Sequence, residues 1–242
     1  MNTEKLFVIV PSTDSYSFLW PGITKKLNKF WQFKSTNYIL SEQMKGNINS
    51  FTIFNSAKDL GWNRNLSNFL KTFEFDYCII CLDDAPPNKP VEQLEINNLI
   101  SLMKKHDLKY INLKGVPKPR GLEIEKDIRS IKDTQKFKAS LHMGLWEKNE
   151  LQKILDFYKS PWELEWDKLK KVTYRKGYAS LIGKKKFSYD HIIIGGKINF
   201  KAFNKIYKKR KPFKVISFLE YKLHLTKIFL FKIKELLFSL IK

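Results

Sequence analysis

Cysteine is scarce in this 242-residue sequence, which contains only two. A small secreted scaffold held together by disulfides needs more cysteines, so that class is excluded. No stretch reaches the roughly 18 uncharged apolar residues that a membrane-spanning helix requires. The first residues, MNTEKLFVIVPSTDSY, lack the basic start, long apolar run and cleavage site of a secretory signal. We therefore expect a cytoplasmic protein.

Several motifs of known chemistry are also missing. The sequence contains no G-x-x-x-x-G-K-[ST] and no G-x-G-x-x-G, which excludes a P-loop and the common dinucleotide fingerprint. It contains no G-x-S-x-G, the motif of the α/β-hydrolase nucleophile. Cys78 and Cys81 form a C-x-x-C without a second pair to complete a zinc site. On a strand this offset points the two side chains to opposite faces, so we predict two buried core cysteines.

Arginine is rare although the chain is strongly basic. Only five of the 45 basic residues are Arg, and the formal net charge is +21. Such a charge favours a nucleic-acid partner or an anionic membrane. Direct readout of bases relies on bidentate arginine, which this chain hardly uses. The excess is also uneven, because residues 197–242 carry 13 basic and only two acidic residues.

Short apolar runs alternate with segments of helical spacing through the first half of the chain. The pattern predicts strands at 5–10, 37–41, 50–55, 76–82 and 109–113, and helices at 23–31, 59–73 and 91–106. This alternation is typical of an α/β protein with a mostly parallel central sheet. Beyond it, we expect an irregular connection over residues 115–133 and a helix over 144–158.

Carboxylates follow two of the predicted strands. Asp14 comes after the first strand, and Asp83 and Asp84 directly follow the apolar run that ends at Leu82. In parallel sheets, ligands bind beyond the carboxyl ends of the strands. Adjacent carboxylates at such an edge suit Mg²⁺ or Mn²⁺, which can neutralise a diphosphate. The alternative is an ordinary Asp-Asp turn before the prolines that follow.

The segment SPWELEW places two carboxylates among tryptophans. Glu163 and Glu165 lie between Trp162 and Trp166, an arrangement that suits a general base beside indoles that stack on a sugar ring. The alternative is an amphipathic segment with surface glutamates. His142 and His191 stand alone in the sequence, and either could contact a metal or phosphate if the fold brings it to Asp84.

The tail over residues 197–242 differs from the rest. A basic stretch with interleaved aromatics is followed by an apolar stretch in which lysine recurs every few residues. This pattern favours a helix lying in the membrane interface, held by apolar burial and anionic lipid. The alternative is a helix docked on the protein's own core or on a sister subunit in a homo-oligomer. The residues expected to meet the membrane are Lys208, Lys209, Arg210, Lys211, Phe218, Phe229 and Phe231.

Five segments occur along residues 5–205 in a recognisable order: VPSTDSYSFLWP, LGWNRNLSNFLKTFEFDYCIICLDD, KASLHMGLWEKNELQKIL, SPWELE and FSYDHIIIGGKI. Together they resemble a family of bacterial glycosyltransferases found with lipopolysaccharide, O-antigen and capsule genes. The resemblance implies a GT-A-like catalytic domain over residues 1–196, with the tail over 197–242 as a membrane-associating segment. It also implies a nucleotide-sugar donor, a saccharide or lipid-linked saccharide acceptor, a divalent cation (Mn²⁺ or Mg²⁺) and a position at the inner face of the cytoplasmic membrane.

The resemblance further implies roles for individual residues. The Asp83–Asp84 pair looks like the DxD-type motif, although its order is D-D, with Asp84 as metal ligand and His191 as a later one. Glu165 looks like the catalytic base of an inverting transfer, and Glu163 is the reserve. Expected contacts with the nucleotide sugar are Asp14, Tyr16, Arg64 and Asp83. Expected stacking partners for the acceptor sugar are Trp162 and Trp146.

Three other functions stay open. A basic nucleic-acid-binding protein would explain the charge and the interleaved aromatics, but not the Asp pair or PWELE. A nucleotidyl- or phosphotransferase on a similar scaffold would use Asp83 and Asp84 without an acceptor base. A catalytically dead membrane scaffold would need neither Asp84 nor Glu165. The transferase interpretation accounts for the charge and the motifs together, so we expect no nucleic-acid partner.

Overall fold

The computed structural model describes residues 4–56, 60–167, 171–172, 175–183, 187–194 and 197–207. The chain divides into two compact units, Met1–Asp190 and His191–Lys242. Among the described residues, no helix has the length and apolar character needed to cross a membrane.

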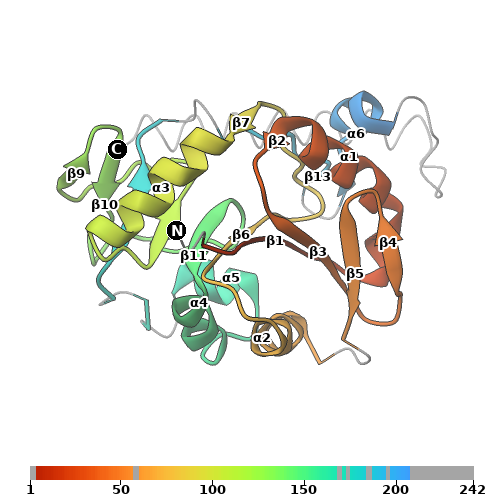
Figure 1. Ribbon diagram of the computed structural model, residues 1–242, viewed down its shortest axis with the longest axis horizontal. Helices are drawn as coiled ribbons and strands as arrows, with labels where there is room; N and C mark the ends of the chain where they lie inside the picture. Colours follow the sequence, from red (N-terminus) through yellow and green to blue (C-terminus); the bar gives the residue numbers. More distant parts are fainter. Residues whose placement is uncertain are drawn as a thin grey trace. The chain divides into compact units, whose positions relative to one another are not determined.

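A ten-stranded sheet forms the centre of the first unit, with the strand order β4-β5-β3-β1-β6-β11-β8-β12-β10-β9 (Figure 1). Strands β5, β3, β1 and β6 pair with one another in parallel, and so do β8 and β12. The pairings of β4 with β5, of β11 with β6 and β8, and of β10 with β12 and β9 are antiparallel. The strands are β1 (Leu6–Pro11), β3 (Thr36–Ser41), β4 (Gly46–Ile48), β5 (Phe51–Asn55), β6 (Tyr77–Ile80), β8 (Tyr110–Asn112), β9 (Glu123–Glu125), β10 (Ile128–Ser130), β11 (Gly144–Glu147) and β12 (Tyr178–Leu181). A separate short parallel pair joins β2 (Trp31–Gln32) to β7 (Val91–Glu92). The expected α/β fold with a parallel sheet behind the Asp pair is confirmed.

Helices cover both faces of this sheet (Figure 1). On one face lie α1 (Trp20–Phe30), entered through the 3₁₀ helix η1 (Asp14–Leu19), and α3 (Gln93–Lys105). On the other lie α2 (Trp62–Thr72), α4 (Lys148–Leu155) and α5 (Pro161–Trp166). Each layer buries its own apolar cluster, because each helix turns one apolar stripe toward the sheet.

The two cysteines of β6 and its end are fully buried and free. Cys78 belongs to the cluster beneath α2 and α4, and Cys81 to the cluster beneath α1 and α3. They therefore lie on opposite faces of the sheet, which confirms the prediction that they are core residues.

Two predictions about local structure are wrong. Residues Gly144–Glu147 form strand β11, not the start of a helix, and β11 lies antiparallel between β6 and β8. Because a strand buried on both faces has no polar alternation, its sequence cannot be told from a buried helix. The connection expected to be irregular contains the hairpin β9–β10, which extends the sheet through β12. Its residues are polar because it forms the edge of the sheet.

The described part of the second unit is small. Strands β13 (Ile193–Ile194) and β14 (Lys197–Ile198) form an antiparallel pair, followed by α6 (Phe200–Tyr207). In α6 the rings of Phe203 and Tyr207 stack with centroids 4.4 Å apart. The predicted membrane residues lie outside the described part of the chain: Lys208, Lys209, Arg210, Lys211, Phe218, Phe229 and Phe231.

Candidate functional site

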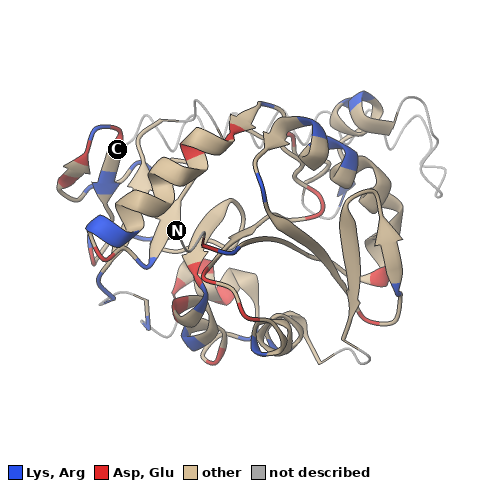
Figure 2. Cartoon of the chain, viewed as in Figure 1, with Lys and Arg blue, Asp and Glu red and all other residues tan. Residues whose placement is uncertain are grey.

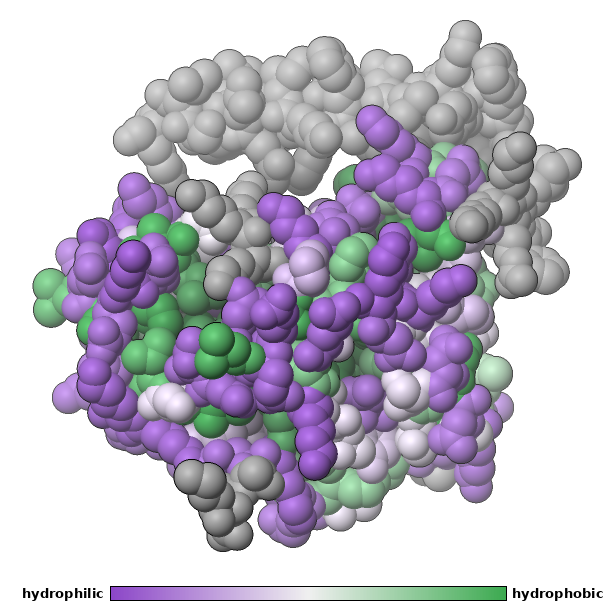
Figure 3. All heavy atoms as spheres, turned by 45° about the horizontal axis from the view of Figure 1, so that its top comes forward, coloured by the Kyte–Doolittle hydropathy of each residue, from purple (hydrophilic) through white to green (hydrophobic). Residues whose placement is uncertain are grey.

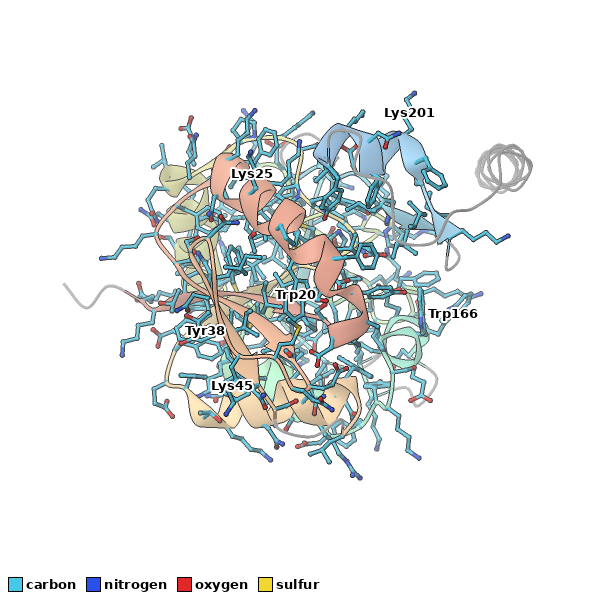
Figure 4. The ribbon with its side chains drawn as sticks, turned by 90° about the vertical axis from the view of Figure 1, so that its right-hand side faces the viewer. Trp20, Lys25, Tyr38, Lys45, Trp166 and Lys201 are labelled. Carbon is cyan, nitrogen blue, oxygen red and sulfur yellow. The ribbon has the colours of Figure 1, made fainter. Side chains whose placement is uncertain are left out.

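The ends of β1 and β6 meet at one edge of the sheet. The two strands pair in parallel from Leu6 opposite Tyr77 to Ile9 opposite Ile80, so the residues that follow each strand emerge together. Ser12 Oγ donates a hydrogen bond to Oδ2 of Asp83 and accepts one from Trp20 Nε1 at 2.7 Å. Trp20 is buried on the inner side of α1 (Figure 4), so the Asp83 carboxylate is anchored to the core.

Asp83 and Asp84 are both largely removed from water. Asp83 is only 6% exposed, and burial raises its pKa to about 7, with a smaller rise from the Asp84 charge and an opposing effect of the Ser12 hydrogen bond. Burial also raises the pKa of Asp84 to about 6. Among the described residues, neither carboxylate forms an ion pair with a protein cation.

This donor set fits a divalent cation. Asp83 is buried and Asp84 is half-buried, and neither pairs with a protein cation among the described residues. Such adjacent carboxylates are the hard oxygen ligands that Mg²⁺ and Mn²⁺ take, and a bound cation would favour their ionised forms. The described residues hold no group of three or more Asp, Glu, His or Cys side chains arranged so that they could together bind a metal ion. Two protein carboxylates agree with Mg²⁺ sites in which substrate phosphates and water complete the coordination.

Asp14 shapes the loop beside this edge. Its carboxylate accepts hydrogen bonds from Ser41 Oγ and, at 3.1 Å, from the backbone N–H of Gln43. Its own backbone N–H donates to Glu42 Oε2 at 2.6 Å. Glu42, which the sequence did not single out, is thereby held at the same edge. Tyr16, on the 3₁₀ helix that begins at Asp14, is exposed.

The segment 140–142 connects Glu165 to the Asp pair. Ser140 Oγ donates to Glu165 Oε1 at 2.5 Å. In the same segment, His142 Nδ1 accepts the backbone N–H of Leu82 at 3.2 Å, directly before Asp83. One short segment therefore contacts both Glu165, the carboxylate expected to act as base, and the backbone directly before Asp83.

Glu163 has a different environment, although it lies on the same short helix. Its Oε2 accepts the backbone N–H of Lys159 at 2.8 Å, and its backbone N–H donates to Ser160 Oγ at 3.2 Å. Ser160 is the N-cap of α5, so one bond caps the helix and the other ties the Glu163 side chain to the residue before the cap. The structure thus gives Glu163 a local structural task and directs only Glu165 toward residues 140–142.

The predicted stacking role of Trp146 is wrong. Trp146 lies on the central strand β11, has 0% exposure and packs against Tyr110 with ring centroids 4.2 Å apart. Because no face of the indole is free, a sugar cannot stack on it. Trp162 is 70% exposed and Trp166 is 56% exposed, and Figure 4 shows Trp166 projecting outward. The ring centroids of Trp166 and Phe137 lie 4.8 Å apart.

Arg64 lines a cavity of about 530 Å³ between the start of α2 and residues 155–159. This volume lies within the range of small-molecule sites. Lys159 also lines the cavity, and within the described residues neither side chain pairs with an acid. No contact described here joins Arg64 to Asp83 or Asp14. His191 opens the second unit, and its backbone carbonyl accepts a bond from Asn199 at 3.0 Å.

Sequence reasoning missed several residues of this site. Ser12 directly follows the first strand, so its position was a signal that could have been used. Ser140 lies in a segment that carries the resemblance, but nothing in the sequence relates it to Glu165. Lys114 carried no signal, because it lies in a loop and is linked to Glu165 only through Ser140 in the tertiary fold.

No family model and no curated protein sequence matches this chain. Many solved structures are similar to this chain, including two of S. aureus TarS and one of UDP-glucose pyrophosphorylase. Residues 1–349 of S. aureus TarS in complex with UDP-GlcNAc align with a TM-score of 0.53 and 16% identity, over 84% of this chain and 64% of that one. UDP-glucose pyrophosphorylase complexed with UDP-glucose aligns with a TM-score of 0.51 and 13% identity, over 86% of this chain and 100% of that one.

A longer S. aureus TarS structure aligns with a TM-score of 0.50 and 14% identity, over 85% of this chain and 39% of that one. The chain therefore spans less than two thirds of the TarS structures. At these identities the likeness establishes the fold alone, and this chain has a GT-A-like α/β fold.

Proposed function

We propose that the protein is a glycosyltransferase that moves a sugar from a nucleotide-sugar donor to a saccharide acceptor. The observation that carries this proposal is the connection of the buried Asp83–Asp84 pair to Glu165 through residues 140–142. Similar folds in complexes with UDP-GlcNAc and UDP-glucose support a nucleotide-sugar donor. The Asp pair would supply a cation for the leaving phosphate, and Glu165 would supply the base for the acceptor.

On the donor side, Asp84 and Asp83 would hold Mn²⁺ or Mg²⁺. A cation there would neutralise the negative charge that develops on the leaving phosphate. Ser12 fixes the Asp83 carboxylate for this task. We further propose that Asp14, Tyr16 and Arg64 contact the donor, and that His191 is a later metal or phosphate ligand.

On the acceptor side, Glu165 takes the proton of an acceptor hydroxyl. The freed oxygen forms a bond to the anomeric carbon while the bond from that carbon to the donor phosphate breaks. The nucleotide phosphate leaves with the electron pair. Because a single base works opposite the leaving group, the configuration inverts. Trp162, exposed on the same helix, offers the acceptor sugar a stacking surface.

We place the acceptor at a membrane. A lipid-linked saccharide of lipopolysaccharide, O-antigen or capsule synthesis lies at the inner face of the cytoplasmic membrane, where the basic tail over 197–242 would hold the enzyme. On the face shown in Figure 3, apolar side chains of the described residues form small separated groups among hydrophilic ones. We assign membrane attachment to the tail because its sequence is basic and apolar, with a docked helix in a homo-oligomer as the alternative.

A nucleotidyltransferase is the second candidate, favoured by the alignment over the whole UDP-glucose pyrophosphorylase chain. It would use the Asp pair but would give Glu165 no proton to remove. A nucleic-acid-binding function has less support, because the Lys and Arg residues of the first unit are scattered among acidic ones (Figure 2).

Donor binding is the first test. The purified chain is heated with UDP-, GDP-, CMP- and dTDP-sugars, with and without Mn²⁺ or Mg²⁺, and slow hydrolysis to free nucleotide is followed. We expect stabilisation by one nucleotide class that requires the cation and is lost in Asp84→Ala. No stabilisation by any donor, together with salt-sensitive binding to oligonucleotides, would contradict the proposal.

A further inference from the structure

A lysine lies beside the Glu165 carboxylate without touching it. Lys114 Nζ donates to Ser140 Oγ at 2.8 Å, and Ser140 Oγ donates to Glu165 Oε1 at 2.5 Å. The cation and the carboxylate therefore lie within about 5.3 Å of each other, the sum of the two bond lengths. Burial lowers the pKa of Lys114, and the Glu165 charge opposes that effect.

The lysine determines what the serine hydroxyl can do. Since a lysine ammonium can only donate, Ser140 Oγ must accept from Lys114 and direct its own proton to Glu165. The order of donors is therefore fixed from Lys114 to Ser140 to Glu165. Oε2 of Glu165 has no hydrogen bond to any residue that the structure describes, so this oxygen is left for an incoming group.

Side chains of β8 hold the backbone of both donors in place. Tyr110 OH donates to the Ser140 carbonyl at 3.2 Å and accepts the Ser140 N–H at 3.0 Å. The Lys114 N–H donates to Asn112 Oδ1 at 2.9 Å, in the turn after β8. Tyr110 and Asn112 are both buried on β8, so one strand anchors both donors.

We propose that Lys114 and Ser140 are positioning residues that hold Oε1 of Glu165, so that Oε2 faces the hydroxyl of the acceptor. This inference rests on the proposed function only for the identity of the proton that Glu165 removes. Lys114 does not touch substrate. It stabilises the carboxylate by charge and fixes its rotation through Ser140, which is how neighbouring groups orient a base.

The alternative is that Lys114 serves stability alone. Three groups in the described structure face Glu165 from other elements: Ser140, Lys114 and Tyr110, whose pKa is raised by burial and, to a lesser extent, by Glu165. On its own helix, the Glu163 carboxylate is bonded to the Lys159 backbone. A positioning role therefore requires that Lys114 senses the charge at Glu165 and not that at Glu163.

This coupling is measured on the full chain without any substrate. The Lys114 ammonium is titrated by NMR in ¹⁵N-lysine-labelled protein, with the signal assigned from Lys114→Arg. We expect Glu165→Gln to lower the measured Lys114 pKa by about 1 or more, because an opposite charge at this distance is removed. Glu163→Gln is the matched control and leaves the titration unchanged. If the Lys114 pKa is the same in folded wild type and folded Glu165→Gln, the inference is overturned.

A second readout uses the donor class found by the binding test. Ser140→Ala and Lys114→Met should lower kcat by about 10- to 100-fold with little change in the donor KM, and Lys114→Arg should restore most of it. Loss of folding stability with an unchanged kcat would overturn the positioning role. Failure of the proposed function looks different, because sugar transfer is then absent with every donor while the Lys114 titration still responds to Glu165→Gln.

Discussion

The indole N–H of Trp20 lies 2.7 Å from Ser12 Oγ, the hydroxyl that donates to Asp83. Trp20 is a core residue of α1, whereas Asp83 belongs to the site at the end of β6. The packing of one helix against the sheet therefore sets the direction of a carboxylate proposed to bind metal. We therefore expect stability and the proposed donor binding to be linked through the Ser12 hydroxyl.

Replacing this indole tests the link. We expect Trp20→Phe to cost about 1 kcal/mol beyond its packing loss, since a buried hydrogen bond disappears, and to weaken binding of the donor and cation. Trp31→Phe is the matched control, because the Trp31 N–H is buried without a partner in the described structure. Denaturant unfolding and donor titration of both variants measure the two effects. Equal donor affinity in the two variants would rule out the link.

The Asp83 carboxyl predicts a dependence of stability on pH. Its folded pKa of about 7 is raised above the ordinary value of 3.8. Between these values the folded state binds more protons than the unfolded state, so the Asp83 contribution to stability is lost as pH rises through 7. Without divalent cations, Asp83→Asn should therefore gain stability relative to wild type between pH 5 and 8.

Unfolding in urea with EDTA across this pH range measures that difference. It should reach on the order of a few kcal/mol at most. Adding Mn²⁺ or Mg²⁺ should stabilise wild type and have little effect on Asp83→Asn. If the difference in unfolding free energy between Asp83→Asn and wild type does not vary with pH, burial does not raise the pKa of Asp83 and this prediction is wrong.

The two glutamates of α5 should respond differently to the same substitution. Glu165→Gln should reduce sugar transfer by at least about 100-fold while leaving donor binding and stability nearly intact, because only the base is lost. Glu163→Gln should cost about 1 kcal/mol of stability through the weakened bond to the Lys159 backbone, with the smaller loss of transfer. Steady-state kinetics and urea unfolding on the same preparations separate the effects. A larger kinetic loss in Glu163→Gln would make Glu163 the base.

Gly144 is a position where the site depends on close packing. A Cβ atom there would lie 2.7 Å from the Ser140 carbonyl oxygen and 2.5 Å from Trp146 Nε1. We expect Gly144→Ala to cost about 1–3 kcal/mol, because the core is overpacked, and to displace Ser140 from Glu165. The variant should therefore lose more activity than its remaining folded fraction explains. If Gly144→Ala is active and has normal stability, the backbone at Ser140 can shift without cost and this prediction is wrong.

The sequence predicts the position of a site residue when that position follows from the strand pattern next to it. Apolar runs ending in polar residues marked β1 and β6, so Asp83 and Asp84 were placed correctly at the sheet edge. The prediction for Trp146 failed, because the sequence around an aromatic residue does not tell whether it lies on a buried central strand or on the surface. Lys114 was also missed, since its relation to Glu165 exists only after residues far apart in the chain are packed together.

The nature of the transferred group tests the central claim most directly. The protein is incubated with the stabilising nucleotide sugar, the cation and saccharide acceptors. The phosphorus-containing products are identified by ³¹P NMR, and the mass of the acceptor product is measured by mass spectrometry. We predict a free nucleoside mono- or diphosphate and an acceptor heavier by one sugar, both lost in Glu165→Gln. Pyrophosphate as a product, or transfer of the nucleotidyl group, would contradict the account and make the protein a nucleotidyltransferase.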